Sequence, residues 1–237
     1  MGEQSRMGLN IVMLGAPGAG KGTQAERFAQ ARALPKISTG DILRRGVKEQ
    51  LPVALLAKEK MDRGDLVDDD TMVTIVRDRL AQPDTDVGFI LDGFPRTVSQ
   101  ARVLDTIIDE RGKGPLLVVD IVVPQDELAR RLSGRRICSA CGANAEPADD
   151  ADSKCRRCGG TPVFRADDTE AVVLERLRVY ARATKPLVEY YRERPTFCAV
   201  NGSQAQAQVA LELSTMVDAV AVRSGVVAVE ARGAGGG

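Results

Sequence analysis

The sequence of 237 residues contains no histidine and no tryptophan, and aromatic residues make up only 3% of it. Without histidine, Ser-His-Asp and Cys-His catalysis and metal sites with histidine ligands are excluded. With so few aromatic rings, the stacking surfaces that bind single-stranded nucleic acid are not expected. Any catalysis therefore depends on carboxylates, Lys, Arg, backbone amides or a cofactor.

An excess of charge of one sign is also missing, because 33 Lys and Arg residues balance 33 Asp and Glu residues. This balance disfavours a protein that coats nucleic acid or an acidic membrane surface. The longest apolar runs, such as residues 116–123, are far too short to span a bilayer, and residues 1–6 are too polar for a secretion signal. We expect a cytoplasmic protein with no nucleic-acid or membrane partner.

Short apolar runs alternate with amphipathic segments along the chain. The apolar runs predict strands at residues 9–14, 88–91, 116–123 and 196–200. Helices are predicted at residues 23–33, 40–65 (two helices, broken at Pro52), 69–80, 98–110, 125–132, 169–194 (interrupted at Pro186) and 204–220. Continuous apolar strands separated by helices predict an α/β fold, in which helices cover both faces of a parallel sheet.

A glycine-rich segment follows the first predicted strand and matches the G-x-x-x-x-G-K pattern of a phosphate-binding loop. Glycines let backbone N–H groups turn toward phosphate oxygens, and the next helix begins with a positive dipole end. The strict pattern has Ser or Thr directly after the lysine, so it assigns no hydroxyl ligand for Mg²⁺ here. We expect ATP to bind Gly18, Ala19, Gly20, Lys21, Gly22 and Thr23, with Lys21 at the β- and γ-phosphates.

Four of the five cysteines form two Cys-x-x-Cys pairs separated by 13 residues, Cys138 with Cys141 and Cys155 with Cys158, each followed by glycine. Two such knuckles are typical of a closed, tetrahedral Zn²⁺ site. A reducing cytoplasm disfavours disulfides, and the pairing of the knuckles disfavours a redox-active motif. We predict a structural zinc site, with iron as the open alternative, and expect Cys198 to be a buried strand residue.

Three motifs together resemble the adenylate kinase family of nucleoside monophosphate kinases, in its long form with a four-cysteine lid. They are the phosphate loop, Ser38-Thr-Gly-Asp-Ile-Leu-Arg44 and Leu91-Asp-Gly-Phe-Pro-Arg-Thr97, and the resemblance covers about residues 9–220. It implies a monomer that reversibly transfers the terminal phosphoryl group of ATP to AMP, giving two ADP and balancing adenine nucleotides. Mg²⁺ would accompany ATP.

The resemblance also implies a division of the chain. The phosphate-loop core would comprise residues 8–37, 68–133 and 169–222, with a helical NMP-binding lobe at 38–67, a small zinc-binding lid at 134–168 and a disordered tail at 223–237. Within the lid, Asn144 and Ala145 stand where the family tends to place a residue that covers the ATP base.

The same resemblance assigns AMP to residues of the lobe and of the second and third motifs. These are Thr39, Arg44, Asp65, Leu66, Val67, Gly93, Phe94, Pro95, Arg96, Gln100, Arg165 and Arg176. An amide such as that of Gln100 can accept from the adenine N6 amine and donate to N1, whereas guanine presents the reverse pattern. Gln100 is therefore the expected reader of the AMP base.

Phosphoryl transfer needs positioning and positive charge rather than covalent chemistry from the protein. The residues that the resemblance assigns to catalysis are Lys21, Arg96, Arg131, Arg135, Arg165 and Arg176. Arg135 and Gln204 would also bind ATP. Asp92 ends a predicted strand, where α/β sheets bind ligands, and is expected to hold Mg²⁺ through water.

Two other functions stay open on the sequence. One is a nucleoside monophosphate kinase that acts on another base. The other is a zinc-ribbon module on a phosphate-loop domain, working as a nucleotide switch or as an interaction protein. The neutral charge and the low aromatic content disfavour this second alternative.

Overall fold

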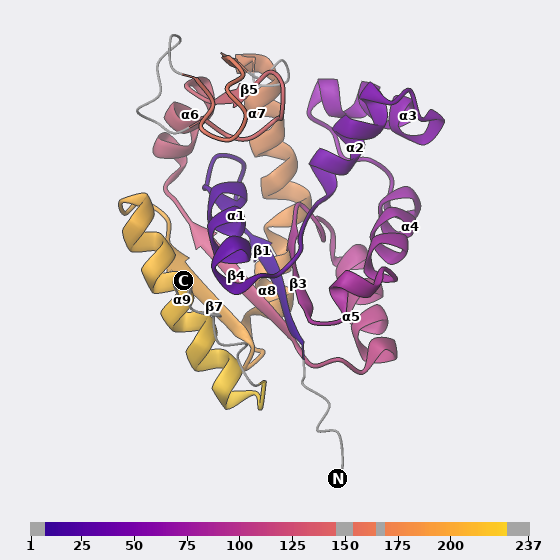
Figure 1. The fold of residues 1–237 in the computed structure, drawn as a ribbon, viewed down its shortest axis with the longest axis vertical. Coiled ribbons are helices and arrows are strands. Elements are labelled where there is room, and N and C mark those ends of the chain that lie inside the picture. Colours follow the sequence, from indigo (N-terminus) through magenta and orange to yellow (C-terminus); the bar gives the residue numbers. More distant parts are fainter. Residues whose placement is uncertain (1–7, 146–153, 165–168, 227–237) are drawn as a thin grey trace, which may run out of the picture.

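A five-stranded parallel sheet lies at the centre of the computed structural model, which describes residues 8–145, 154–164 and 169–226 (Figure 1). Its strands follow the order β2-β3-β1-β4-β7. They are β1 (Leu9–Leu14), β2 (Lys36–Ser38), β3 (Gly88–Asp92), β4 (Leu116–Val122) and β7 (Phe197–Asn201). The predicted α/β class is confirmed, and the three-residue edge strand β2 is an addition that its short, mixed sequence did not predict.

Helices connect these strands and cover the sheet. They are α1 (Lys21–Arg32), α2 (Thr39–Lys48), α3 (Pro52–Arg63), α4 (Asp69–Leu80), the 3₁₀ turn η1 (Pro83–Thr85), α5 (Val98–Arg111), α6 (Gln125–Ser133), α7 (Glu170–Val179), the π-helical turn η2 (Tyr180–Thr184), α8 (Pro186–Arg192) and α9 (Gln206–Arg223). A separate antiparallel hairpin joins β5 (Arg136–Cys138) to β6 (Pro162–Phe164). Within the described part of the chain, no helix is both long and apolar enough to cross a membrane.

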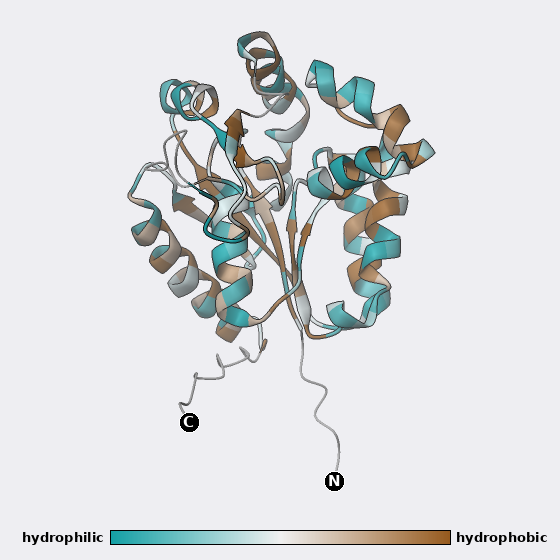
Figure 2. Ribbon diagram, turned by 45° about the horizontal axis from the view of Figure 1, so that its top comes forward, coloured by the Kyte–Doolittle hydropathy of each residue, from teal (hydrophilic) through white to brown (hydrophobic). Residues whose placement is uncertain are grey.

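The central strand β1 is buried on both sides, since successive side chains of a strand point to opposite faces. Leu9, Ile11 and Met13 pack with α1 and α9 on one face, and Val12 and Leu14 pack with α4, α5 and α8 on the other. Figure 2 shows the hydrophobic strands between helices whose outer faces are hydrophilic. This two-sided burial explains why the strand is apolar at every position except one.

Local sequence signals explain where the lobe helices α2 and α3 begin and where α3 ends. The Ser38 hydroxyl accepts from the backbone N–H of Asp41 at 3.3 Å and caps α2. Pro52 begins α3, where its missing N–H costs nothing, and Gly64 ends α3 with φ of 83°. The predicted break at Pro52 is thus confirmed.

The long helix near the C-terminus has the predicted interruption at Pro186, where a new helix, α8, begins. The form of the interruption was not predicted: the chain widens into the π-helical turn η2 just before the proline, where the Lys185 N–H donates to the Tyr180 carbonyl at 2.8 Å. The wider turn accommodates a proline without ending the helical path.

The C-terminal boundary also lies later than the sequence suggested. The tail was expected from residue 223, but α9 runs to Arg223 and Val226 is buried against the core formed by α1 and α9. The Val226 N–H donates to the Ala221 carbonyl at 2.8 Å. Residues 227–237 lie outside the described part of the chain.

The start of β3 requires glycine. Gly88 has φ of 112°, and a Cβ placed there would lie 2.5 Å from the backbone nitrogen and oxygen of Leu9. Neither atom can move away, because Leu9 is paired with Gly88 in the sheet. The close approach of β1 and β3 therefore depends on this residue.

We predict that Gly88→Ala lowers the free energy of unfolding by at least about 3 kcal/mol, since it combines a left-handed φ with a backbone collision. Gly112→Ala is the matched control: it too has a positive φ, of 58°, but a Cβ there meets nothing within 4 Å. The control should cost about 1–2 kcal/mol, the conformational part alone. Urea unfolding measures both, and equal losses would contradict the steric argument.

Candidate active site

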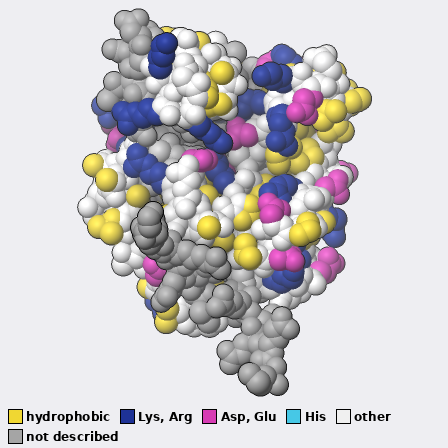
Figure 3. All heavy atoms as spheres, viewed as in Figure 1, with side chains coloured by type: hydrophobic (Ala, Val, Ile, Leu, Met, Phe, Trp, Pro, Cys, Tyr) yellow, Lys and Arg dark blue, Asp and Glu magenta, His cyan; other side chains and the backbone are white. Residues whose placement is uncertain are grey.

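One cavity of about 1020 Å³ lies beyond the carboxyl ends of the strands, between the helical lobe formed by α2 and α3 and the β5–β6 hairpin (Figure 1). The phosphate loop, the end of β3, the lobe and the hairpin all contribute to its lining. Figure 3 shows Lys and Arg side chains on both sides of this hollow. Segments far apart in the sequence therefore meet at one place, as expected for a site at the topological switch point of a parallel sheet.

The phosphate loop holds its lysine in a preset position. The Lys21 ammonium donates to the carbonyl oxygens of Gly15 and Ala16 at 2.8 and 2.9 Å. Gly15, Gly18 and Gly20 have positive φ values of 135°, 84° and 94°, which the tight loop requires. Burial lowers the pKa of Lys21 to about 8 against the opposing effect of Asp92.

Two carboxylates, from the strands on either side of β1, lie near this lysine. Asp92 ends β3 and pairs in register with Met13, and a Cβ on Gly22 would lie 3.2 Å from its Oδ2 atom. Asp120 is buried in β4 opposite Leu14, the last residue of β1. Burial raises the pKa of Asp120, and the charge of Lys21 opposes that rise.

The third motif folds back on itself after β3. The Arg96 Nε donates to the Gly93 carbonyl at 2.8 Å. Gly93 has φ of 87°, and a Cβ there would lie 2.9 Å from the Thr39 hydroxyl, so the motif packs closely against the start of α2. The peptide bond between Phe94 and Pro95 is cis. The loop thereby places Arg96 beside the lobe residues of the second motif.

The remaining predicted arginines have protein partners in this structure. Arg131 donates to the Glu127 carboxylate at 2.6 Å and to the Gly202 carbonyl at 2.9 Å. Arg44 pairs with Asp41 at 2.5 Å, and this pairing lowers the Asp41 pKa despite burial, which alone would raise it. Anionic groups thus hold these cations in place.

Residues of the lid side approach the phosphate loop. Arg135 donates to the Asn144 amide oxygen at 3.0 Å, and a Cβ on Gly22 would lie 3.4 Å from the Asn144 amide nitrogen. Asn144, Ala145 and Phe164 all line the cavity. Gln204 also lines it, although its side-chain amide donates to Glu212 at 2.5 Å.

The structure brings nearly all of the predicted site residues to this one cavity. Those in its lining are Gly18, Ala19, Gly20, Lys21, Gly22, Thr23, Thr39, Arg44, Asp65, Leu66, Val67, Asp92, Gly93, Pro95, Arg96, Gln100, Arg131, Arg135, Arg176 and Gln204. Phe94 is different: its ring is 1% exposed and packs in the core, because the motif turns it toward the sheet. Arg165 lies outside the described residues.

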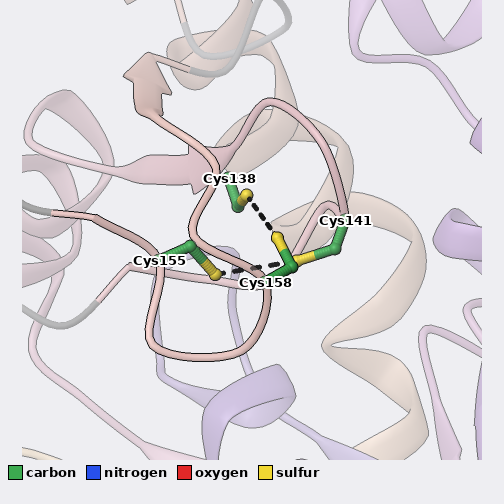
Figure 4. A group of neighbouring side chains, drawn as sticks. All are labelled: Cys138, Cys141, Cys155 and Cys158. Carbon is green, nitrogen blue, oxygen red and sulfur yellow. Dashed lines mark hydrogen bonds between the residues drawn. The ribbon is translucent and has the colours of Figure 1, made fainter.

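The four predicted metal ligands form a second cluster, away from the cavity centre. Their Sγ atoms all lie within 4.8 Å of one another (Figure 4). The Cys138 and Cys158 sulfurs are 3.5 Å apart and those of Cys141 and Cys155 are 3.7 Å apart, far beyond a disulfide bond. Four sulfurs at 2.3 Å from a tetrahedral Zn²⁺ are about 3.8 Å from one another, so the cluster fits that ion.

The two knuckles have the same backbone hydrogen bonds. The Gly142 N–H donates to the Cys138 carbonyl at 2.9 Å, and the Gly159 N–H donates to the Cys155 carbonyl at 2.7 Å. These glycines have φ values of 71° and 74°, as predicted from their positions after each pair. Gly160 is needed for contact, since a Cβ there would lie 2.7 Å from the Cys138 sulfur.

Comparison with known proteins agrees with this geometry. A family model described as adenylate kinase matches residues 13–196. The adenylate kinase of Archaeoglobus fulgidus is 43% identical over 217 residues, which cover 90% of this chain and 99% of that protein. The adenylate kinase of Moorella thermoacetica is 47% identical over 86% of this chain and 96% of its own length, and that of a Geobacillus species is 47% identical over 83% and 92%.

The chain belongs to the adenylate kinase family. It is a phosphotransferase that converts ATP and AMP into two ADP. This outcome confirms the function expected from the three motifs and decides against the nucleotide switch and against a kinase for another base. The four-cysteine cluster of this kinase lies in its lid region.

Three residues around the active site of this kinase were not identified as site residues from the sequence. Asp120 is a single acid within an apolar strand, and that interruption was the available signal. Tyr180 lines the cavity from the π-helical turn, and burial raises its pKa to about 12. Asp69 accepts from Gln100, a contact between two helices that no sequence spacing indicates.

We predict that ATP binding to this kinase takes up a proton near pH 8.5. A nucleotide phosphate favours charged Lys21, whose pKa of about 8 in the free enzyme leaves roughly three quarters of it neutral at that pH. Affinity for ATP should therefore fall as the pH rises above 8. Calorimetry in two buffers of different ionisation enthalpy measures the uptake.

Lys21→Arg is the control for this prediction, because arginine stays protonated throughout this range. The proton uptake of the wild type should exceed that of the variant by about 0.5–0.7. Equal uptake in the two proteins would show that Lys21 does not titrate on binding.

Proposed function

We propose that ATP and AMP occupy opposite ends of the one cavity, with their phosphates facing each other. ATP would lie on the phosphate loop, with Arg135 and Gln204 beside it, and AMP would lie between the lobe and the third motif. The observation that carries this proposal is the shared lining: Lys21 and Gln100 border the same 1020 Å³ space, which is large for a single small ligand.

The charge of the lining supports two phosphorylated substrates. Among the described residues, eight Lys and Arg residues border the cavity, against three Asp and Glu residues. The chain as a whole is neutral, so positive charge is concentrated at this place. Such a concentration lowers the repulsion between two anionic nucleotides and raises their rate of encounter.

In the transfer step, an oxygen of the AMP phosphate would attack the γ-phosphorus of ATP, and the bond from that phosphorus to the β–γ bridging oxygen would break. The bridging electron pair would leave with the first ADP, and the former AMP would leave as the second. Lys21, Arg96, Arg131 and Arg176, together with Arg165, would stabilise the charge of the equatorial oxygens. The chain would supply positioning and cations and form no covalent bond.

Asp92 is the proposed anchor for Mg²⁺. Its carboxylate lies at the carboxyl end of β3 beside Gly22, on the ATP side of the cavity. Because Gly22 has no hydroxyl, the loop would supply no side-chain ligand at that position, and the Asp92 carboxylate would hold the ion through water. Bound together with ATP, Mg²⁺ would neutralise part of the phosphate charge.

The lid cluster is proposed to hold one structural Zn²⁺. All four cysteines are thiolate donors, so no open position remains for chemistry. The strands β5 and β6 have three residues each, and Val163 and Phe164 are exposed, so a metal would replace the apolar core that this hairpin lacks. Closure of the lid (residues 134–168) and of the lobe (38–67) would then exclude water from the cavity.

Two finer features stay predictions from the sequence. They are a cytoplasmic location and a monomeric state. Sedimentation velocity of the purified chain measures the second.

We predict that Lys21→Ala lowers kcat by about 10²–10⁴-fold, because one charge on the transferring phosphate is lost in a water-excluded site. Lys58→Ala is the control, since Lys58 lies on the outer side of α3 and pairs with Asp62 there. The control should keep wild-type rates in an ADP-forming assay. A Lys21→Ala enzyme within tenfold of the wild type would contradict the assignment.

We predict one zinc ion per chain, which Cys155→Ser should bind more than about 100-fold more weakly. Loss of the metal should unfold the lid before the sheet, giving an additional low-temperature transition in calorimetry. Cys198→Ala is the matched control, because Cys198 is buried in β7, far from the cluster in sequence and not part of it. An unchanged zinc affinity of Cys155→Ser, measured by competition with a chelator, would refute the ligand set.

A further inference from the structure

Gln100, the proposed reader of the AMP base, is held by two partners in the free enzyme. Its amide nitrogen donates to the Asp69 carboxylate at 2.7 Å, and its amide oxygen accepts from the backbone N–H of Arg96 at 2.7 Å. Thr97 completes the network: its hydroxyl donates to the other Asp69 oxygen at 2.9 Å and accepts from the Gln100 N–H at 3.1 Å. Gln100 is only 1% exposed.

The two partners fix the orientation of the amide without ambiguity. A carboxylate can only accept, so the atom that faces Asp69 is the nitrogen. A backbone N–H can only donate, so the atom that faces Arg96 is the oxygen. A flipped Gln100 would place oxygen against carboxylate and N–H against N–H, two repulsive contacts in a buried setting.

The contacts leave the amide with capacity for a base. An amide has two donor hydrogens and two acceptor lone pairs, and Asp69 and Arg96 use one of each. One donor and one lone pair remain, which is the number that the N1 and N6 edge of adenine requires. Hypoxanthine and guanine present a carbonyl at C6 and an N–H at N1, and pair only with the flipped amide.

We propose that Asp69 is a specificity-determining residue of this kinase, which selects adenine in the acceptor by fixing the orientation of the Gln100 amide. The inference rests on the proposed role of Gln100 as base reader. Asp69 itself is absent from the lining of the cavity, as far as the described residues define it, so it acts as a positioning residue. It lies in the first turn of α4, beside α5, which carries Gln100.

This arrangement also changes the best way to test Gln100. Gln100→Glu would place two carboxylates at the 2.7 Å separation that now joins amide and carboxylate. Their repulsion would disturb the site for reasons unrelated to the base. Gln100→Leu removes the amide without that conflict.

The experiment compares AMP with inosine monophosphate as the acceptor, because the two differ only at the C6 group and at N1. In Asp69→Asn, the new amide can donate as well as accept, so one of the two penalties for a flipped Gln100 disappears. The ratio of kcat/KM for AMP to that for inosine monophosphate should fall about tenfold. The KM for ATP should stay unchanged. Asp69→Glu keeps an acceptor-only group and should retain most of the discrimination.

Glu110→Gln is the structural control, since it removes another contact between α4 and α5, the ion pair of Glu110 with Arg77 at 3.4 Å, and leaves the Asp69–Gln100–Thr97 network intact. It should leave the ratio unchanged. The proposal is overturned if Asp69→Asn keeps the wild-type ratio, or if Glu110→Gln lowers the ratio equally. Should Asp69→Asn fail to fold, Asp69→Ser replaces it with the same expectation.

Gln100→Leu distinguishes the proposed role of Asp69 from the proposed role of Gln100 as reader of the AMP base, on which it rests. If Gln100→Leu keeps the wild-type ratio, Gln100 does not read the base, and the proposed assignment of the acceptor site fails together with the role of Asp69. If Gln100→Leu lowers the ratio and Asp69→Asn does not, only the role of Asp69 is refuted.

Discussion

The repulsion between two phosphorylated nucleotides is the constraint that shapes this structure. An enzyme that brings the two nucleotides together must hold many cations in one place before the substrates bind. These cations repel one another as well. In this chain, protein acceptors hold the cations in the absence of substrate. Lys21 donates to two carbonyl oxygens, Arg131 donates to Glu127 and Arg44 forms an ion pair with Asp41. Phosphate oxygens are acceptors of the same kind, so in the proposed arrangement the substrate phosphates would take the place of these partners.

The parallel sheet decides where those cations gather. The carboxyl ends of β1, β3 and β4 lie side by side, which brings the phosphate loop, Asp92 and Asp120 within one small region. Burial of this region lowers the pKa of Lys21 and raises that of Asp120. The same low dielectric strengthens every contact to a developing charge. Two-sided apolar burial of the strands therefore supports the chemistry as well as the fold.

The sheet core and the segments outside the sheet contribute different parts of the site. The core positions the phosphate loop and the Asp69–Gln100 pair through buried contacts, and the lobe and the hairpin contribute residues from outside the sheet. Thr184, at the end of the π-helical turn, donates to the Arg96 carbonyl at 3.0 Å and so connects the helix that follows the lid to the third motif. This bond joins two residues that are 88 positions apart in the sequence and that both line the cavity.

Much of the fold followed from periodicity alone. The strands that are buried on both faces are apolar at nearly every position, and the helices between them begin or end at residues such as Ser38, Pro52 and Gly64, so their positions were predicted to within a few residues. The edge strand β2 and the hairpin β5–β6 were not predicted, because three residues contain no measurable period. The π-helical turn was not predicted either, because it depends on how the turn before Pro186 accommodates the proline.

The sequence by itself determined the phosphate loop, the four-cysteine cluster and the family, because each depends on residue types at short, fixed spacings. The tertiary structure decided everything that depends on distance between remote segments. It turned the Phe94 ring into the core, placed Asp120 beneath the loop and set Asp69 against Gln100. A hydrogen bond across 31 residues leaves no pattern in one chain, because either partner alone is an ordinary polar residue of a helix.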